Sequence, residues 1–283
     1  MHPKTQLHVS GLNLLSRCGI AFEYRYMKGL KLPPDVGLTI GKAVDVAVNT
    51  NMQAKVDTGH LLETEAVEAL ARDAVVAGFD EVEIEESYRM LGKQGARDKA
   101  VDSSVILSRL HHRQAAPKIS PTHVQRQWVV DIDGLDIQVA GTIDIQEGSR
   151  SIRDTKTSKK SPAADLADTS LQLTAYALAV KAHDGMIPDK VHLDYLVNTK
   201  SPKLVQLESV RDAVSFQHLL ERINRAYQVI GSGMFSPAYP ESWWCSNSWC
   251  GYWRMCPYAA RPVSVVVSQD LEDSLRKSSE VVK

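Results

Sequence analysis

Hydrophobic and polar residues alternate with a period of two along residues 137–146, and three further stretches in the central part of the chain are strand candidates. Such alternation predicts strands that have one buried face and one more polar face. The short polar segment 147–150 contains a glycine and predicts a hairpin connection between the second and third stretches. The four predicted strands are residues 127–132, 137–146, 151–157 and 191–197.

On both sides of these strands, apolar residues recur every three to four positions, which is the period of a helix. Residues 9–118 are predicted to be mainly helical, and the adjacent His111 and His112 are expected on a helix surface. A helix that carries Gln172 should cross between the last two strands, and a helix over 209–230 should end at the glycines that follow it. Helices packed on a central sheet predict an α/β fold.

The chain has 283 residues, of which 43% are hydrophobic, enough for one large domain or two small ones. The net charge of −1 does not indicate a generally basic nucleic-acid-binding protein, although charge can be concentrated locally. Lys159 and Lys160 are candidates for such local contacts, or belong to a solvated turn. No signal-peptide pattern opens the sequence, and no apolar run approaches the ~20 residues that span a membrane, so a cytoplasmic protein is expected.

Asp144, Asp154 and Lys156 are the leading candidates for catalysis. Folding about the predicted hairpin places Asp144 almost opposite Asp154, and Lys156 shares the face of Asp154 because it lies two positions on. The two carboxylates could then share a cation, and without one their charges would repel and raise one pKa. Oxygen ligands favour Mg²⁺ or Mn²⁺, and carboxylates beside an amine suit hydrolysis of a phosphodiester. Either motif alone is more often a solvated surface pair.

Gln172 and Tyr176 lie four residues apart on the predicted helix and therefore on one of its faces. By themselves they are equally consistent with ordinary polarity on a helix surface. They become specific site candidates because they follow the motif of Asp144, Asp154 and Lys156.

The four cysteines are unevenly distributed, with Cys18 near the start and a Cys-x4-Cys-x5-Cys pattern near the end. Because a cytosolic protein rarely keeps structural disulfides, four thiolates on one metal centre are favoured over two disulfides. One distant ligand plus a loop of three fits an iron–sulfur cluster better than a zinc ribbon, while zinc and unrelated buried thiols stay as alternatives. The clustered cysteines are Cys245, Cys250 and Cys256.

Together these residues resemble the PD-(D/E)XK nuclease superfamily in its RecB-like, iron–sulfur branch. They are similar to the CRISPR-associated RecB-like exonucleases and to the nuclease domain of the AddB helicase subunit. The resemblance implies a restriction-endonuclease-like core, with a central mixed sheet flanked by helices and an iron–sulfur region that joins the N- and C-terminal parts. The matching core residues are Asp144 (G-x-x-D), Asp154 and Lys156 (D-x-K), and Gln172 and Tyr176 (Q-x-x-x-Y).

The resemblance also implies catalytic roles. Asp144 and Asp154 would hold Mg²⁺ or Mn²⁺ together with the carbonyl of Thr155. Lys156 would orient the attacking water or stabilise the developing charge. Where the family usually has a histidine, this chain has Asp45, which is either a further oxygen ligand of the metal or only a helix-surface carboxylate.

Other family features are matched in part. Gln172 and Tyr176 would position the catalytic strand or the substrate backbone. A glutamate often found early in the family core is missing, and Gln125, to which no role is assigned, is near its place. The thiolates that would bind a [4Fe–4S] cluster are those of Cys18, Cys245, Cys250 and Cys256.

The implied function is that of a metal-dependent DNA nuclease. An exonuclease on single-stranded DNA or DNA ends is favoured, in recombination, repair or CRISPR-type adaptation, with a helicase, recombinase or integrase as candidate partner. The alternatives are a non-catalytic DNA-binding or assembly subunit that retains the nuclease fold, and a zinc-stabilised binding protein. The expected parts are a mainly helical N-terminal part (1–120) with Cys18 and Asp45, the nuclease core (121–235), the cysteine loop (236–262) and a tail (263–283).

Overall fold

The computed structural model describes residues 5–259 and 261. The chain divides into two compact units, residues 1–235 and residues 236–283, and each is described by itself. The expected tail, residues 263–283, lies outside the described residues. None of the helices in the described part combines the length and apolarity that crossing a lipid bilayer requires.

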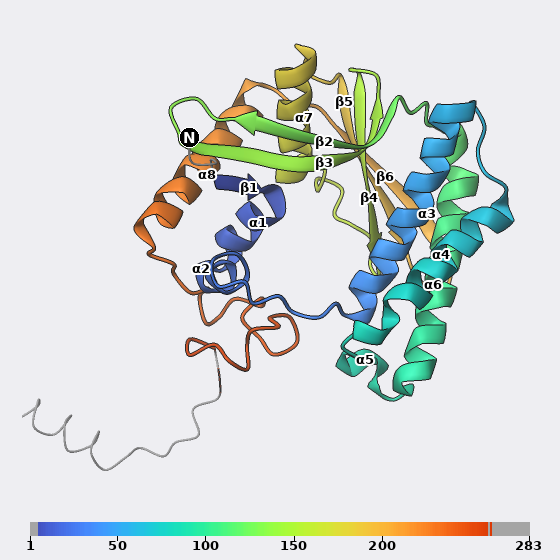
Figure 1. The fold of residues 1–283 in the computed structure, drawn as a ribbon, viewed down its shortest axis with the longest axis horizontal. Coiled ribbons are helices and arrows are strands. Elements are labelled where there is room, and N and C mark those ends of the chain that lie inside the picture. The colour runs from blue at the N-terminus through green and yellow to red at the C-terminus, as the bar shows by residue number, and fades with distance from the viewer. Residues whose placement is uncertain (1–4, 260, 262–283) are drawn as a thin grey trace, which may run out of the picture. The chain divides into compact units, whose positions relative to one another are not determined.

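A six-stranded mixed sheet forms the centre of the first unit (Figure 1). The strands are β1 (Thr5–His8), β2 (His123–Asp131), β3 (Ile137–Glu147), β4 (Ser151–Ser158), β5 (Lys190–Val197) and β6 (Lys203–Ser209). β1 runs parallel to β3 and β4 runs parallel to β5, whereas the other pairs are antiparallel. All four predicted strands are present, and the predicted hairpin joins β3 to β4. Strands β1 and β6 were not predicted from the sequence.

Helices lie on two sides of this sheet (Figure 1). The α-helices are α1 (Val9–Arg17), α2 (Gly19–Phe22), α3 (Val36–Thr58), α4 (Thr64–Gly78), α5 (Glu86–Arg89), α6 (Gly92–Gln114), α7 (Leu171–Asp184) and α8 (Ala213–Ser232). Short π- and 3₁₀-helical turns occupy Glu23–Met27, Phe79–Glu81 and Ala116–Lys118. As predicted, α7 connects the parallel strands β4 and β5, which need a crossover of this kind. The α/β fold with a mixed sheet and flanking helices is therefore confirmed.

The two groups of helices bury separate hydrophobic cores. α3, α4 and α6 pack against one another, and their core includes Ile145 of β3 and Leu196 of β5. The second core joins α1, α7 and α8 to the other side of the strands, with Ile152 of β4 and Leu193 of β5 at its centre. Strands β4 and β5 therefore lie between two apolar layers, and the carboxylates of Asp154 and Asp194 within them are shielded from water.

Local sequence signals explain how the helices near the centre begin and end. The side chains of Asp35 and Ser170 accept hydrogen bonds from backbone N–H groups in the first turns of α3 and α7. Gly233 adopts a left-handed backbone with φ 68° and ends α8, in agreement with the predicted stop. The predicted start of this helix at residue 209 is wrong, because β6 continues to Ser209 and α8 begins at Ala213.

The expectation of a surface position for His111 is also wrong. His111 is completely buried, because α6 packs against α3, α4, β5 and β6 and has few free faces. Ala100, Ser104 and Leu107 precede it at helical spacing and are likewise buried. Neither ring nitrogen of His111 has a hydrogen-bond partner among the described residues. Burial lowers the pKa of His111 to about 4, so the ring is neutral at pH 7.

Candidate active site

Strands β3 and β4 are paired near the hairpin and part at Asp144 and Asp154, and we call this point the fork. One edge of β3 pairs with β2, whereas its other edge pairs with β1 at the start and with β4 at the end. The last paired residues before the fork are Ile145 of β3 and Arg153 of β4. The same register places Asp144 opposite Asp154 at the next position, where the strands part. The backbone N–H of Thr155 donates a hydrogen bond to Oδ2 of Asp144 (3.3 Å), which ties the carboxylate to β4.

Lys156 lies beside Asp154 on the same face of β4. Its Nζ donates a hydrogen bond to Oδ1 of Asp154 (2.9 Å) and lies 2.8 Å from Oδ2. The side chain of Asp154 is fully buried, and Oδ2 has no properly oriented hydrogen-bond donor among the described residues. Lys156 keeps 39% of its side chain exposed. A buried carboxylate oxygen without a donor is uncommon, because such oxygens are normally satisfied, and its chemistry fits a cation ligand.

The pKa values of the two carboxyl groups at the fork are raised. Burial raises the pKa of Asp144 to about 8, and the negative charges of Asp154 and Asp45 add to this effect. Burial also raises the pKa of Asp154, although Lys156 opposes this change. Burial would lower the pKa of Lys156, but the charge and hydrogen bond of Asp154 outweigh it and raise that pKa. If both carboxyl groups were ionised, their negative charge would exceed what one lysine compensates, so Asp144 is largely protonated at pH 7 without a cation, as expected for carboxylates placed to share one.

Asp45 approaches this pair from α3. Gly41, one helical turn earlier, contacts β4 closely, since a Cβ atom at Gly41 would lie 3.3 Å from Oγ1 of Thr157. This contact brings α3 against the strand. Oδ1 of Asp45 accepts a hydrogen bond from Asn49 (2.8 Å), and burial raises the pKa of Asp45, with Asp154 among the contributing charges. Asp45 is thus an electrostatic neighbour of the pair, held by its own helix.

Gln172 and Tyr176 meet on the face of α7. Nε2 of Gln172 donates to the hydroxyl of Tyr176 (2.7 Å). Burial raises the pKa of Tyr176, and the charges of Asp154 and Asp144 raise it further, so the hydroxyl stays protonated beside the carboxylates. α7 therefore places both side chains near the fork.

Gly141 allows an aromatic side chain to lie against β3. A Cβ atom at this position would be 2.8 Å from the ring of Trp128 on β2, so any side chain would displace the indole. Trp128 in turn meets Tyr176 edge to face, with ring centroids 6.4 Å apart. The glycine of the G-x-x-D motif thus supports Tyr176 through Trp128.

Gln125 is a neighbour of the site that received no role in the sequence analysis. It lies on β2 directly across from Asp144, and its Nε2 donates to Oδ1 of Asp144 (3.3 Å). It is also a non-glycine residue with a left-handed backbone, at φ 52°, which carries strain. The signal that could have identified it is its position in the register, since its neighbours Val124 and Arg126 pair with Ile145 and Ile143 on either side of Asp144.

Two other acidic clusters near the fork are fully paired. Asp184, the last residue of α7, accepts two hydrogen bonds from Arg126 (2.8 Å each) and one from Gln146 (2.9 Å). The hydrogen bond from Arg126 lowers the pKa of Asp184 to about 2. On β4, Arg153 binds Glu147 (2.6 Å) and the buried Asp194 (3.3 Å). These carboxylates have arginine partners, in contrast to Asp144.

The cysteines are free thiols, and none forms a disulfide. Cys18 stands between α1 and α2, where its Sγ accepts a weak hydrogen bond from the N–H of Ala21 (3.5 Å). In the second unit, residues 236–259 and 261 form turns without a helix or strand. Each of its three cysteines, Cys245, Cys250 and Cys256, donates a backbone hydrogen bond to a residue three or four positions earlier.

Across the described residues, no three His, Cys, Asp or Glu side chains are grouped so that they could hold a metal ion. At the fork, the close carboxylates are two, Asp144 and Asp154. The donor set still suits a hard divalent cation, because it consists of carboxylate oxygens, one of them without a donor.

The profile of the PD-(D/E)XK nuclease superfamily matches residues 6–257. The chain belongs to this superfamily. Its members are phosphodiester-cleaving nucleases that typically use Mg²⁺ or Mn²⁺. The matched range includes the fork, α3 with Asp45, and the three clustered cysteines. A search of curated proteins gave no significant match.

One solved structure supports the same fold for this PD-(D/E)XK protein. A protein from Eubacterium rectale, named "Putative exonuclease", is 12% identical, with a TM-score of 0.55, and the match covers 92% of this chain and 91% of the other. A protein named SSO0001 is also 12% identical, with a TM-score of 0.41 over 93% and 90% of the two chains. At this identity, the first likeness shows a shared fold only, and the second is too weak to carry an argument.

Proposed function

We propose that this protein is a metal-dependent deoxyribonuclease that hydrolyses phosphodiester bonds at the fork between β3 and β4. The observation that carries the proposal is the facing pair Asp144 and Asp154 with Lys156 beside it. Membership of the nuclease superfamily supports it, because this is the chemistry of the family. The raised pKa of Asp144 supports it as well, since groups arranged for catalysis often have shifted pKa values.

Asp144 and Asp154 would hold Mg²⁺ or Mn²⁺, together with the carbonyl of Thr155. When bound, the ion supplies a water of lowered pKa and polarises a phosphate oxygen. Asp45 is proposed as a further ligand or as a base for a metal-bound water, because its charge already acts on the pair.

The remaining residues act on the substrate and on the site itself. Lys156 would donate hydrogen bonds to a phosphate oxygen and offset the charge that develops on it. Its partly exposed ammonium allows this contact. Tyr176 and Gln172 form a hydrogen-bonded pair that would keep the strand in place and orient the substrate backbone. Burial of Asp154 excludes water and strengthens these interactions.

The proposed substrate is single-stranded DNA or a DNA end, and the proposed mode is exonucleolytic. The word "exonuclease" in the name of the Eubacterium rectale protein agrees with this mode. The proposed settings are recombination, repair or CRISPR-type adaptation inside the cell, with a helicase, recombinase or integrase as candidate partner. These are consequences of the resemblance to the RecB-like branch.

We further propose a [4Fe–4S] cluster bound by Cys18, Cys245, Cys250 and Cys256. The donor set suits it, because the described cysteines are all free thiols and are partly buried. Zinc on the same thiolates is the alternative. Assay of iron, sulfide and zinc in anaerobically purified protein separates the two, and Cys→Ser at any of the four should release the metal and lower the melting temperature.

A second candidate function is a non-catalytic DNA-binding subunit. It is favoured by the hydrogen bond between Asp45 and Asn49, and by the lack of a three-ligand metal group among the described residues. In that case the fork would bind DNA without cleaving it.

The deciding experiment is cleavage of end-labelled single- and double-stranded DNA with Mn²⁺, Mg²⁺ or EDTA. Asp154→Ala and Lys156→Ala should both abolish metal-dependent cleavage. Asp189→Ala, which removes an exposed carboxylate paired with Arg150, serves as the control and should cleave normally. A folded wild type that binds DNA but cleaves neither substrate would favour the non-catalytic subunit.

A further inference from the structure

Two adjoining cavities in the first unit connect the candidate active site to helix α8. One has a volume of about 660 Å³ and is lined by residues of α1, α7, α8 and the ends of β4 and β5. The other has a volume of about 520 Å³ and lies between α1 and α8. His218 and Arg222 line both cavities, so together the cavities form one continuous groove.

The first cavity reaches the proposed catalytic site at Lys156. Its walls include Lys156 and Gln172, two residues of the proposed catalytic site, together with Tyr195 of β5. A molecule that lies in this cavity therefore has one end beside the ammonium of Lys156. The far end of the groove is the second cavity, whose walls contain no residue of the proposed site.

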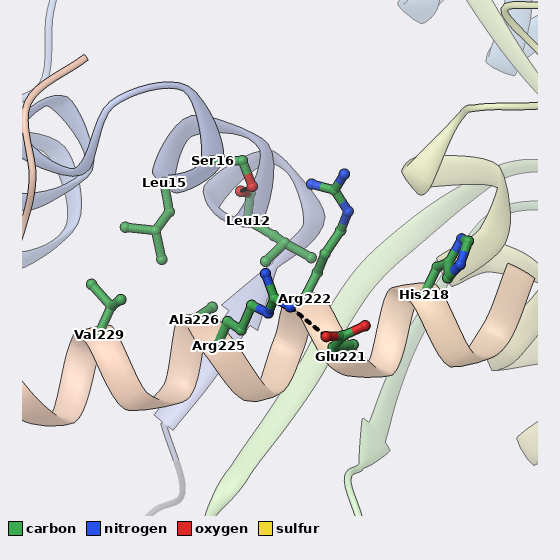
Figure 2. Close-up of a pocket in the computed structure, with 9 residues that line it drawn as sticks. All are labelled: Leu12, Leu15, Ser16, His218, Glu221, Arg222, Arg225, Ala226 and Val229. Carbon is green, nitrogen blue, oxygen red and sulfur yellow. Dashed lines mark hydrogen bonds and ion pairs between the residues drawn. The ribbon is translucent and has the colours of Figure 1, made fainter. Parts of the chain in front are cut away.

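One face of α8 lines the groove with basic side chains (Figure 2). His218, Arg222 and Arg225 follow one another at intervals of four and three residues, and so share a helical face. Arg222 forms no hydrogen bond or ion pair with the rest of the described chain, and it extends from α8 toward α1 in Figure 2. Arg225 has only an exposed ion pair with Glu221. Arg17, at the end of α1, lines the same groove from the other side.

The acidic residues along the groove are already engaged. Asp212 caps the first turn of α8 through hydrogen bonds from Ser215. Asp168 accepts a hydrogen bond from Ser209 (2.6 Å). The arginines of α8 therefore dominate what an incoming ligand meets, although the chain as a whole has a net charge of −1.

We propose that this groove holds the phosphate backbone of a single polynucleotide strand as it leaves the active site, with Arg222 and Arg225 as its phosphate contacts. The proposal rests on the proposed nuclease function and adds the path of the substrate. A slot between two packed helices admits one strand, whereas a duplex would lie across its rim. Phosphate contacts of this kind set position and affinity without reading sequence.

The length of the basic face agrees with such a ligand. From His218 to Arg225 the helix rises roughly 10 Å. A strand stacked as in a duplex carries a phosphate about every 3.4 Å of its axis and a more extended strand carries fewer, so up to about three phosphates would lie along this face. Arg222 and Arg225 would then contact successive phosphates. The groove would thus act on substrates of several nucleotides and not on a single phosphodiester.

The test compares two double variants. Arg222→Gln/Arg225→Gln removes one unpaired arginine and one arginine in an exposed ion pair. Arg72→Gln/Arg89→Gln is the matched control, because Arg72 is exposed on α4 and Arg89 has an exposed ion pair with Glu86. Neither control residue lines the groove. Melting curves of both variants should overlay that of the wild type.

Binding of a fluorescein-labelled single-stranded oligodeoxynucleotide is measured by anisotropy in EDTA, over a range of salt concentrations. The groove variant should bind about tenfold more weakly at low salt. The slope of log K against log salt should fall by about 1.4, from about 0.7 for each of two lost phosphate contacts. The control should match the wild type. Equal binding and equal slope for the groove variant and the wild type would overturn the proposal, as would a wild type that does not bind.

A second readout separates the groove from the chemistry. Hydrolysis of bis(p-nitrophenyl) phosphate with Mn²⁺ requires only the fork, so the groove variant should keep the wild-type rate while its cleavage of long single strands falls. Absence of hydrolysis of both substrates by the wild type, with normal binding that depends on Arg222 and Arg225, would reject the nuclease function and retain the groove. Unchanged cleavage of long strands by the groove variant would reject the groove and retain the nuclease.

Discussion

Asp144 and Asp184 are acidic residues on neighbouring elements with opposite electrostatics. Asp184 at the end of α7 is bound by Arg126 and Gln146, and the hydrogen bond from Arg126 lowers its pKa to about 2. Asp144 at the fork faces another carboxylate, Asp154, and burial raises its pKa to about 8. The carboxylate of Asp184 is neutralised by Arg126, whereas Asp144 accepts hydrogen bonds from Thr155 and Gln125 but has no ion pair among the described residues.

The same contrast appears between adjacent residues of β4. Arg153 points to one side of the strand and neutralises Glu147 and Asp194. Asp154 points to the other side and has a single cation, Lys156, with one carboxylate oxygen left without a donor. A single strand thus serves stability on one face and the proposed chemistry on the other. The difference teaches that burial alone does not mark a site, whereas burial combined with incomplete neutralisation does.

The strongest test of this contrast is Asp144→Asn. We expect cleavage to fall on the order of 10³-fold, because a metal ligand and its charge are lost. Without divalent metal, the variant should be at least as stable as the wild type, since asparagine keeps the shape of the side chain and is neutral without taking up a proton. Nuclease assays and chemical denaturation measure the two effects. A loss of stability above about 1 kcal/mol would contradict the raised pKa of Asp144.

His111 extends the comparison, because it is a buried titratable group without a hydrogen-bond partner among the described residues. His111 has a folded-state pKa of about 4, below its ordinary value of 6.5, so the unfolded chain binds more protons between these pH values. Stability is therefore complete above about pH 6.5 and is lost as the pH falls towards 4, by up to about 3 kcal/mol.

His111→Leu should remove most of this pH dependence, and denaturation at pH 7.5 and pH 5 measures it. His60→Gln, on an exposed histidine, is the control and should behave as the wild type does. Equal loss of stability at pH 5 in His111→Leu and the wild type would mean that another group is responsible.

The counterpart of Asp144→Asn is Asp184→Asn, which changes a carboxylate that already has an arginine partner. It removes the charge that Arg126 and Gln146 bind, and it should cost about 1–2 kcal/mol of unfolding free energy at pH 7. Cleavage should be within about twofold of the wild type, because Asp184 is not at the fork. Denaturation and nuclease assays should thus give the opposite pattern from Asp144→Asn. Normal stability together with lost cleavage would contradict the structural role of Asp184.

The smallest expected effect is stabilisation by the metal itself. At a free concentration five times its Kd, Mg²⁺ or Mn²⁺ should add about 1 kcal/mol to the unfolding free energy of the wild type. Asp144→Asn should show little of this gain, and Asp184→Asn should show all of it. Thermal melts in EDTA and in metal provide the measurement. An equal gain in all three proteins would place the metal somewhere other than the fork.

Much of the fold could be predicted from the sequence because its signals are local. The alternation in 137–146 and 151–157, and the turn between them, specified both strands and the register that brings Asp144 opposite Asp154. The spacing of Gln172 and Tyr176 likewise predicted a shared face on α7. These inferences depend only on short-range geometry.

The features that could not be predicted depend on contacts between segments that are distant in the sequence. β1 has only four residues, and it becomes a strand because β3 offers a free edge. The pairing of Arg126 with Asp184, 58 residues away, has no local signature. His111 was misplaced, although small residues at helical spacing before it did indicate a buried face. The groove could not be predicted either, because α1 and α8 lie at opposite ends of the first unit's sequence.

Gly141 and Gly231 should differ in how well they tolerate replacement by a residue with a side chain. At Gly231, within α8, a methyl group would meet no atom within 4 Å, so alanine should be accepted there and even favour the helix. At Gly141, the same methyl group would strike the indole of Trp128. A library of random variants selected for nuclease activity should therefore tolerate almost any small residue at 231 and retain only glycine at 141.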